Sequence, residues 1–273
     1  MTEHPRAAGL PSLAVCQSVL ENVDMAGDLD LLVETGTDSF AVLGALLRKT
    51  GVDETRELMT ARGLAASSYH AGMRILEMDD STADQTLHDG LSTAAALGAP
   101  ILMTGTGPAG LRSPAAADDV VVERLGRVAP LAADLGIVMA IEPVHPFLRG
   151  AGYVHTLGHA AELARRTPQV AVALDVVHVS WDRDFFADVE RCADVVCTVH
   201  VSDFDASAMQ ERRWGRAVAG AEIAPVGATI RALARAGFHG SYEDETLLPW
   251  VDRATCIANI RASRQWFDRL WQA

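Results

Sequence analysis

Short apolar segments alternate with longer amphipathic segments from one end of the chain to the other. Several of the short segments are rich in Val, Ile or Thr and several follow a glycine, as β-strands commonly do. In the longer segments, apolar residues recur at intervals of three and four, which is the period of an α-helix with one buried face. The predicted strands are 12–19, 38–43, 63–69, 99–104, 136–142, 170–175, 195–201 and 240–245. The predicted helices are 24–35, 51–62, 82–97, 115–135, 156–167, 183–193, 224–236 and 253–270.

The segment 115–135 shows how these helices are bounded. Asp118 and Asp119 lie near its start, where negative charge interacts favourably with the helix dipole. Gly136 follows it and predicts the end of the helix. Pro130 lies inside it and predicts a kink or a break, because proline cannot donate a backbone hydrogen bond.

Eight strands, each followed by a helix, predict a single (β/α)8 TIM barrel spanning residues 1–273. This fold typically needs about 250 residues. A doubly wound open sheet is the alternative, but no GxGxxG motif follows the first strand. We find no linker, repeat or low-complexity segment. The loop 202–223, after the seventh strand, is long for a barrel connection, and long loops are frequently functional.

Composition narrows the classes of partner. Of the 273 residues, 49% are hydrophobic, enough for a substantial core. Lys plus Arg number 23 against 36 Asp plus Glu, which gives a formal charge of −13. Nucleic acids and anionic membranes both need clustered positive charge, so we expect neither as a partner. Lys49 is the single lysine, so a Schiff-base mechanism would have to use it.

The spacing of the cysteines and the sequence of the N-terminus indicate the cellular compartment in which we expect the protein. No CxxC motif is present, which favours reduced thiols with structural roles over disulfides or a zinc finger. The sequence shows no signal peptide, and no apolar stretch approaches the roughly 20 residues of a membrane span. We therefore expect a cytoplasmic protein. The cysteines are Cys16, Cys192, Cys197 and Cys256.

Four successive predicted strands end in side chains that bind metals. In a TIM barrel, the reactive residues lie at the carboxyl ends of the strands, on one rim. Burying three carboxylates together is costly unless a cation is present or some are protonated. Three oxygen donors and one imidazole suit Mn²⁺ first, with Mg²⁺, Co²⁺, Fe²⁺ or Zn²⁺ as alternatives. The four residues are Glu142, Asp175, His200 and Glu245.

The motifs EPVHP, LDVVHVSWD, HVSDF and GFHGSYEDETL, in this order and spacing, resemble the xylose-isomerase-like barrel superfamily of sugar (phosphate) isomerases and epimerases. The resemblance covers nearly the whole chain. It implies one divalent metal held by Glu, Asp, His and Glu from the last four strands, at positions matching the four residues above. It also implies that His178, three residues after Asp175, contacts a substrate oxygen.

Two positions depart from the family pattern. An arginine precedes a Pro-Gly-x-Gly stretch in the family; here RAVAGAEI places Arg216 there, but the stretch is altered, so Arg212 and Arg213 are rivals. The last strand carries both Glu243 and Glu245, which point to one face by the period of two. We prefer Glu245, which matches the family's glutamate counted from Gly240.

Other residues in the rim loops are candidates for substrate binding. His70 ends the third strand, His145 lies three residues after Glu142, and Trp181 and Trp214 could wall a pocket. The fourth strand ends in the turn GTGP without a histidine, which argues against the three-metal nucleases of the superfamily. That turn predicts either a tight connection or an anion site built from backbone N–H groups. Trp266 and Trp271 are expected to pack in the last helix, and Asp203 to cap a loop.

These residues predict an isomerase or epimerase acting on a sugar or sugar-like hydroxy-ketone through an enediolate. Glu142 and Glu245 would form the acid/base pair. A metal-dependent dehydratase or lyase, or iron-dependent oxygen chemistry, would use the same site, and a non-catalytic barrel subunit is a further alternative. We expect a neutral polyol ketone as substrate, or a sugar-like moiety of a larger metabolite held against Trp181 or Trp214, with no need for a phosphate group. The chain could form a homodimer or homotetramer.

Overall fold

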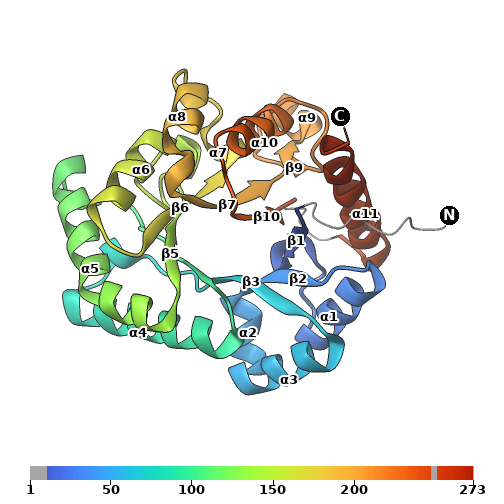
Figure 1. Ribbon diagram of the computed structural model, residues 1–273, viewed down its shortest axis with the longest axis horizontal. Coiled ribbons are helices and arrows are strands. Elements are labelled where there is room, and N and C mark those ends of the chain that lie inside the picture. Colours follow the sequence, from blue (N-terminus) through green and yellow to red (C-terminus); the bar gives the residue numbers. More distant parts are fainter. Residues whose placement is uncertain (1–10, 247–250, 273) are drawn as a thin grey trace.

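The computed structural model describes residues 11–246 and 251–272, in which eight parallel strands close into a barrel surrounded by helices (Figure 1). Around the ring the strands follow the order β1-β10-β7-β6-β5-β4-β3-β2, and β1 pairs with both β10 and β2. This confirms the TIM barrel and excludes the open sheet. The strands are β1 Leu13–Cys16, β2 Ser39–Leu43, β3 Ala65–His70, β4 Ile101–Met103, β5 Val138–Ile141, β6 Val170–Asp175, β7 Val196–Val201 and β10 Ser241–Asp244.

The helices lie outside the strands, and eight of them match the predicted segments within one or two residues at each end. These are α1 Met25–Glu34, α3 Val52–Arg62, α4 Asp80–Leu97, α5 Pro114–Leu135, α6 Leu157–Arg166, α8 Phe185–Cys192, α10 Val226–Arg235 and α11 Arg253–Leu270. Three short helices were not predicted: α2 Gly44–Thr50, α7 Val176–Val179 and α9 Ala206–Gln210.

Helix α5 shows both a confirmed and a wrong prediction. It ends at Leu135 and is capped by Gly136, whose φ of 66° is the left-handed conformation that glycine adopts readily. The predicted break at Pro130 is wrong, because the helix continues through it to Leu135. Pro130 lies on the exposed side of the helix, whereas its neighbours Ala129 and Ala132 are buried against the core. Packing of the buried face therefore outweighs the loss of one backbone hydrogen bond.

The first strand is shorter than predicted. β1 ends at Cys16, and Gln17–Val19 form a 3-10 turn. The Gln17 side chain explains the early end, because it donates to Asp28 Oδ2 at 3.0 Å and accepts from the Leu43 backbone N–H at 2.9 Å. These bonds turn the chain towards α1 and join the ends of β1 and β2.

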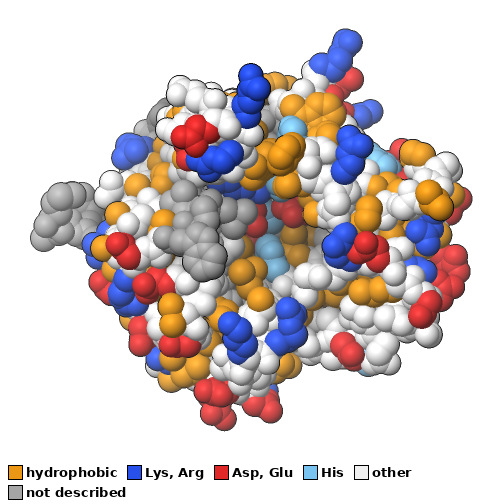
Figure 2. Space-filling model, turned by 180° about the vertical axis from the view of Figure 1, so that it is seen from behind, with side chains coloured by type: hydrophobic (Ala, Val, Ile, Leu, Met, Phe, Trp, Pro, Cys, Tyr) orange, Lys and Arg blue, Asp and Glu red, His pale blue; other side chains and the backbone are white. Residues whose placement is uncertain are grey.

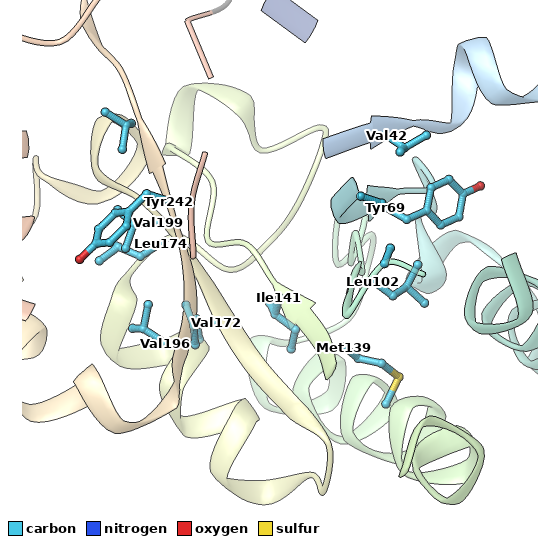
Figure 3. Close-up of a cluster of buried hydrophobic side chains, with 14 of the residues drawn as sticks. Val42, Tyr69, Leu102, Met139, Ile141, Val172, Leu174, Val196, Val199 and Tyr242 are labelled. Carbon is cyan, nitrogen blue, oxygen red and sulfur yellow. The ribbon is translucent and has the colours of Figure 1, made fainter. Parts of the chain in front are cut away.

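Alternation along the strands divides the core into two layers. Outward-facing side chains, including those of Leu102, Met139 and Tyr242, pack against the helices (Figure 3). Inside the barrel, Ile101, Met103, Ala140 and Ala173 form a small apolar cluster. Beyond this cluster, towards the carboxyl ends of β6, β7 and β10, the inward positions are polar. The barrel thus supplies a rigid apolar base for a polar site at one rim.

None of the helices in the described ranges is long and apolar enough to span a membrane.

Candidate metal centre

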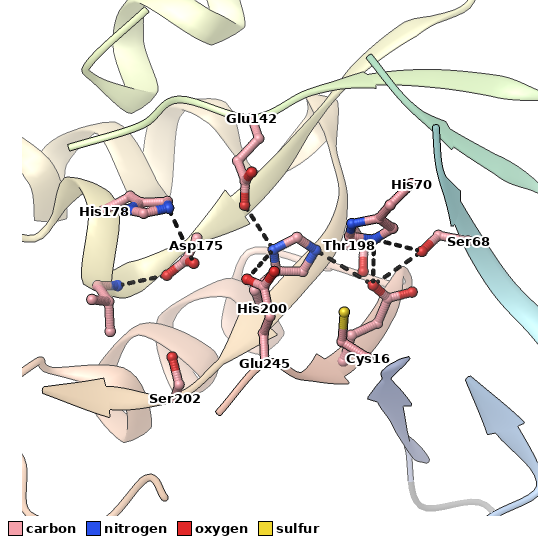
Figure 4. Close-up of polar contacts among 12 residues, drawn as sticks. Cys16, Ser68, His70, Glu142, Asp175, His178, Thr198, His200, Ser202 and Glu245 are labelled. Atoms are coloured by element: carbon pink, nitrogen blue, oxygen red, sulfur yellow. Dashed lines mark hydrogen bonds and ion pairs between the residues drawn. The ribbon is translucent and has the colours of Figure 1, made fainter. Parts of the chain in front are cut away.

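The four predicted ligands converge at the carboxyl ends of adjacent strands. Glu142 directly follows β5, Asp175 ends β6, His200 lies in β7, and Glu245 directly follows β10. One donor atom from each lies within 4.8 Å of the donor atoms of the other three. Figure 4 shows the imidazole of His200 between the carboxylates, with Nδ1 2.8 Å from Glu142 Oε1 and 3.1 Å from Glu245 Oε2. This convergence of carboxylates and one imidazole suits a divalent cation and supports its presence.

The charges of this cluster depend on one another. Burial disfavours charge on His200, yet Glu245 and Glu142 outweigh it and hold the pKa of the imidazole well above its ordinary value. Burial opposes ionisation of Glu245 as well, but the positive charges of His200 and Arg216 hold the pKa of that carboxyl well below its ordinary value. The pKa of Glu142 is lowered in the same way, by the hydrogen bond and charge of His200 acting against burial. Before a metal ion binds, the positive charges of His200 and Arg216 thus favour the ionised forms of Glu142 and Glu245.

Of the three candidate arginines, Arg216 lies at this cluster, which it reaches from the long loop after β7. Two short antiparallel strands, β8 Asp203–Phe204 and β9 Arg216–Ala217, form a ribbon in which Phe204 pairs with Arg216. The guanidinium lies 2.6 Å from Asp175 Oδ2 and 3.0 Å from Glu245 Oε2. Arg212 and Arg213 line a separate cavity at the rim.

Asp203 holds the base of this ribbon. Its Oδ1 accepts hydrogen bonds from the backbone N–H of Phe204 and of Ala224, both at 2.8 Å. The two N–H groups belong to the beginning and end of the loop, so a single buried carboxylate joins them. The expectation that Asp203 caps a loop agrees with this geometry.

His178 lies beside Arg216 and one turn beyond Asp175. Asp175 Oδ1 accepts from the Val177 N–H at 2.9 Å and begins the short helix α7, which turns His178 back towards the site. His178 Nε2 is 3.0 Å from Arg216 Nη2 and 3.7 Å from Asp175 Oδ2. The predicted neighbour of the substrate therefore lies at the edge of the donor cluster.

Glu243 occupies a second position, on the opposite side of the His200 ring. It pairs in register with His200 across β10 and β7, and its Oε2 lies 3.4 Å from His200 Nε2. The same oxygen is 3.2 Å from Ser68 Oγ and 3.6 Å from His70 Nε2. Glu245 is thus the glutamate that joins the four-residue cluster, and Glu243 supports His200 from behind.

Three of the residues around this second position were not singled out from the sequence. Ser68 comes from β3, and Thr198, on the inner face of β7, bonds to Ser241 of β10 at 2.9 Å. Cys16 ends β1, and its thiol lies close to His70 and Glu245; burial raises the pKa of this thiol. Strict alternation was the available signal for Ser68 and Thr198, which lie two residues before His70 and His200 on the same strands. No predicted site residue lies on β1, so the same signal was not available for Cys16.

A cavity of about 450 Å³ with a mixed polar and apolar lining opens beside Glu142 and His70. We call it the polar cavity because the Glu142 carboxylate and the hydroxyls of Thr104 and Thr106 belong to its lining residues. Thr104 and the first two residues of the GTGP turn, Gly105 and Thr106, contribute to its wall. A side chain at Gly105 would place its Cβ 2.1 Å from the Met73 carbonyl oxygen, so this turn is a close backbone connection. Figure 2 shows the corresponding face of the molecule, hollowed at its centre with acidic and histidine side chains at the floor.

The remaining aromatic candidates lie either at a second cavity on the rim or against the core. His145, Trp181 and Trp214 line a second rim cavity of about 460 Å³, so His145 faces aromatic rings and lies outside the donor cluster. Trp266 and Trp271 pack against the core beneath the last helix, as expected. The described cysteines are free thiols, with Cys192 and Cys256 buried in the core.

The sequence from residue 29 to residue 269 matches the model of one protein family, described as the xylose isomerase-like TIM barrel. The chain belongs to the xylose isomerase-like TIM barrel family. No curated protein sequence matches it.

Solved structures share the fold over almost the whole chain. A protein from Sinorhizobium meliloti is 26% identical with a TM-score of 0.78, over 93% of this chain and 97% of that one. The IolI protein with a bound zinc atom is 17% identical, with a TM-score of 0.76 over 94% and 97% of the two chains. D-psicose 3-epimerase of Clostridium cellulolyticum, with D-tagatose, is 14% identical, with a TM-score of 0.74 over 94% and 98%.

Proposed function

We propose that this protein is a divalent-metal-dependent isomerase or epimerase that acts on a sugar or sugar-like hydroxy-ketone through an enediolate. The observation that carries the proposal is the convergence of Glu142, Asp175, His200 and Glu245 within 4.8 Å at one rim of the barrel. Membership of the family and the likeness to a ketose epimerase support it. Manganese is the cation that we expect first.

The protein residues would divide the chemistry between two carboxylates. A bound divalent cation would supply polarisation of the ketone and its neighbouring hydroxyl. Glu142 and Glu245 come from opposite sides of the His200 ring nitrogen and would flank the substrate. One removes the α proton, and the other returns a proton to the opposite face in an epimerase or to the adjacent carbon in an isomerase. His178 and Arg216 would hold substrate oxygens at the edge of the cluster.

Metal analysis and proton exchange test this function directly. We expect one divalent ion for each chain, and substrate-dependent exchange of the α proton in D₂O with a panel of unphosphorylated ketohexoses. Glu142→Gln and Glu245→Gln should each lower turnover by at least about a hundredfold, because amides keep the size and lack the basicity. Glu54→Gln, on the exposed face of α3, is the matched control and should leave turnover unchanged.

Two outcomes would contradict the proposal. A protein that keeps no divalent ion after loading with manganese has no metal site of this kind. Exchange that persists in Glu142→Gln or Glu245→Gln, with the ion still bound, would remove that glutamate from the acid/base pair. A product that has one water less than the substrate would instead indicate a dehydratase or lyase that uses the same metal and an enolate of the substrate.

A further inference from the structure

Exposed apolar side chains gather at one place on the rim, beside the candidate metal centre. Large hydrophobic side chains normally lie scattered on a protein surface, and a group of them around a hollow marks a binding site. Here they surround the cavity of about 460 Å³, and Trp181 and Met209 are 48% and 49% exposed. The apolar residues of this wall are Phe147, Trp181, Phe204, Met209, Trp214 and Ile223.

Trp214 connects this cavity to the residues of the metal centre. Its ring stacks on His178, with centroids 5.5 Å apart and planes 25° apart. His178 Nε2 in turn lies 3.7 Å from Asp175 Oδ2. Trp214 also stacks on Phe147, with centroids 6.3 Å apart and planes only 5° apart. A ligand in this cavity therefore contacts a wall that it shares with the proposed substrate site.

The loop after β5 places the polar and apolar cavities side by side. Glu142 lines the polar cavity and His145, three residues later, lines the apolar one. The polar cavity carries hydroxyl, carboxylate and backbone groups suited to a polyol. The apolar cavity carries aromatic faces, with Arg212 and Arg213 among its lining, and Arg213 is paired with Glu211 at 2.9 Å. The two cavities thus favour the two halves of one molecule, of which the second half presents a ring to the aromatic faces.

We propose that the substrate carries an apolar, ring-containing substituent, and that the cavity lined by Trp181, Met209 and Trp214 binds it. The inference rests on the proposed function, since it places the sugar-like half over the metal centre. The volume of about 460 Å³ accommodates an aromatic ring or a small fused ring system. Aromatic rings stack in offset or edge-to-face contact with other aromatic rings, which is what this wall offers.

Binding of matched glycosides to the manganese-loaded protein tests the inference without requiring turnover. The probes are phenyl β-D-glucopyranoside, methyl β-D-glucopyranoside and phenol, with affinities measured by calorimetry. We expect the phenyl glycoside to bind at least tenfold more tightly than the methyl glycoside, and phenol to compete with it. Met209→Glu, which puts a charge into the cavity, should abolish the difference while the affinity for Mn²⁺ stays unchanged.

Phe186→Glu is the matched control. Phe186 is 50% exposed, close to the exposure of Met209, and lies on α8 outside the cavity. The control should keep the tenfold preference. Equal affinities for the two glycosides, no binding of any probe, or a preference that survives Met209→Glu would overturn the inference. So would a dimer that Met209→Glu dissociates without changing the ratio of affinities, since the cavity would then be an interface between copies. Failure of the proposed function appears separately, as absent metal or absent proton exchange.

Discussion

The position of Glu243 shows how a single buried side chain can tune the candidate metal centre. It is completely buried, and its Oε2 faces His200 Nε2 while His200 Nδ1 faces Glu142 and Glu245. A carboxylate on the outer nitrogen of a metal-binding histidine orients the ring and increases its basicity. We expect Glu243→Gln to weaken Mn²⁺ binding by about 10- to 100-fold, measured by competition with a chelator.

Ser68→Ala is the control for this change. Ser68 Oγ donates to the same oxygen of Glu243 at 3.2 Å but does not contact His200. It should weaken Mn²⁺ binding far less than Glu243→Gln. Equal losses in the two variants would show that Glu243 acts through general packing of the barrel interior and does not orient His200.

Asp28 lies outside the candidate metal centre, and its raised pKa predicts that the stability of the fold depends on pH. Burial raises the pKa of its carboxyl from 3.8 to about 6, against the hydrogen bonds from Gln17 and Asn22. The folded state then holds this proton more tightly than the unfolded state, so the contribution of Asp28 to stability falls as the pH rises from about 4 to 6. The loss is about 3 kcal/mol across that window.

The Asp28→Asn variant isolates this contribution, because an amide does not titrate there. We expect the free energy of unfolding of the native protein, measured in urea, to fall relative to that of Asp28→Asn between pH 4 and pH 6. Above about pH 7 the difference should be constant. A difference that stays constant over the whole range would contradict the raised pKa.

At the scale of elements, most of the barrel follows from the sequence pattern because each strand and helix carries its own periodicity. The ends of β5, β6, β7 and β10 meet at one rim, so the donor residues could be placed together before any coordinates. The resemblance named Arg216 with Arg212 and Arg213 as rivals, but no periodicity could single it out, because β8 and β9 are each only two residues long. Likewise, α7 depends on one hydrogen bond from Val177 to Asp175, which no periodicity reveals.

Because Asp203 holds the base of the ribbon of β8 and β9, we expect its substitution to lower both stability and activity. Asp203→Ala would leave the buried N–H of Ala224 and the N–H of Phe204 without their acceptor. We expect a loss of about 1–3 kcal/mol in the free energy of unfolding. Because Phe204 pairs with Arg216, kcat/KM should fall as well. Urea unfolding and steady-state kinetics measure the two effects.

Asp205→Ala is the control that distinguishes an effect of the ribbon from an effect of the whole loop 202–223. Asp205 Oδ1 caps α9 by accepting from Ser207 and Ala208, only two residues away from Asp203. Losing this cap should cost about 1 kcal/mol and leave kcat/KM unchanged. A similar fall in kcat/KM for both variants would mean that the site depends on the order of the entire loop and not on the ribbon.

At the scale of the whole molecule, charge decides which substrates can approach. The chain carries a formal charge of −13. The donor cluster holds three carboxylates, and Glu243, behind His200, brings a fourth negative charge to the same place. As a metal ligand His200 is neutral. Arg216 and one divalent ion then compensate three of these four negative charges, which leaves the metal-bound centre near −1 before substrate arrives. Among the described residues that line the polar cavity, the one arginine is Arg74, and its guanidinium is paired with Glu77 at 2.6 Å.

A dianionic phosphate would therefore enter a site without an unmatched positive charge among the described lining residues. We expect an unphosphorylated ketose to react with a kcat/KM at least as high as that of its 6-phosphate, measured on matched pairs with the manganese-loaded enzyme. Raising the ionic strength should narrow any gap between the two, since screening weakens the repulsion of the anion. A preference of about a hundredfold for the phosphate, which corresponds to about 2.7 kcal/mol of transition-state binding, would contradict this charge balance and require an anion site elsewhere on the rim.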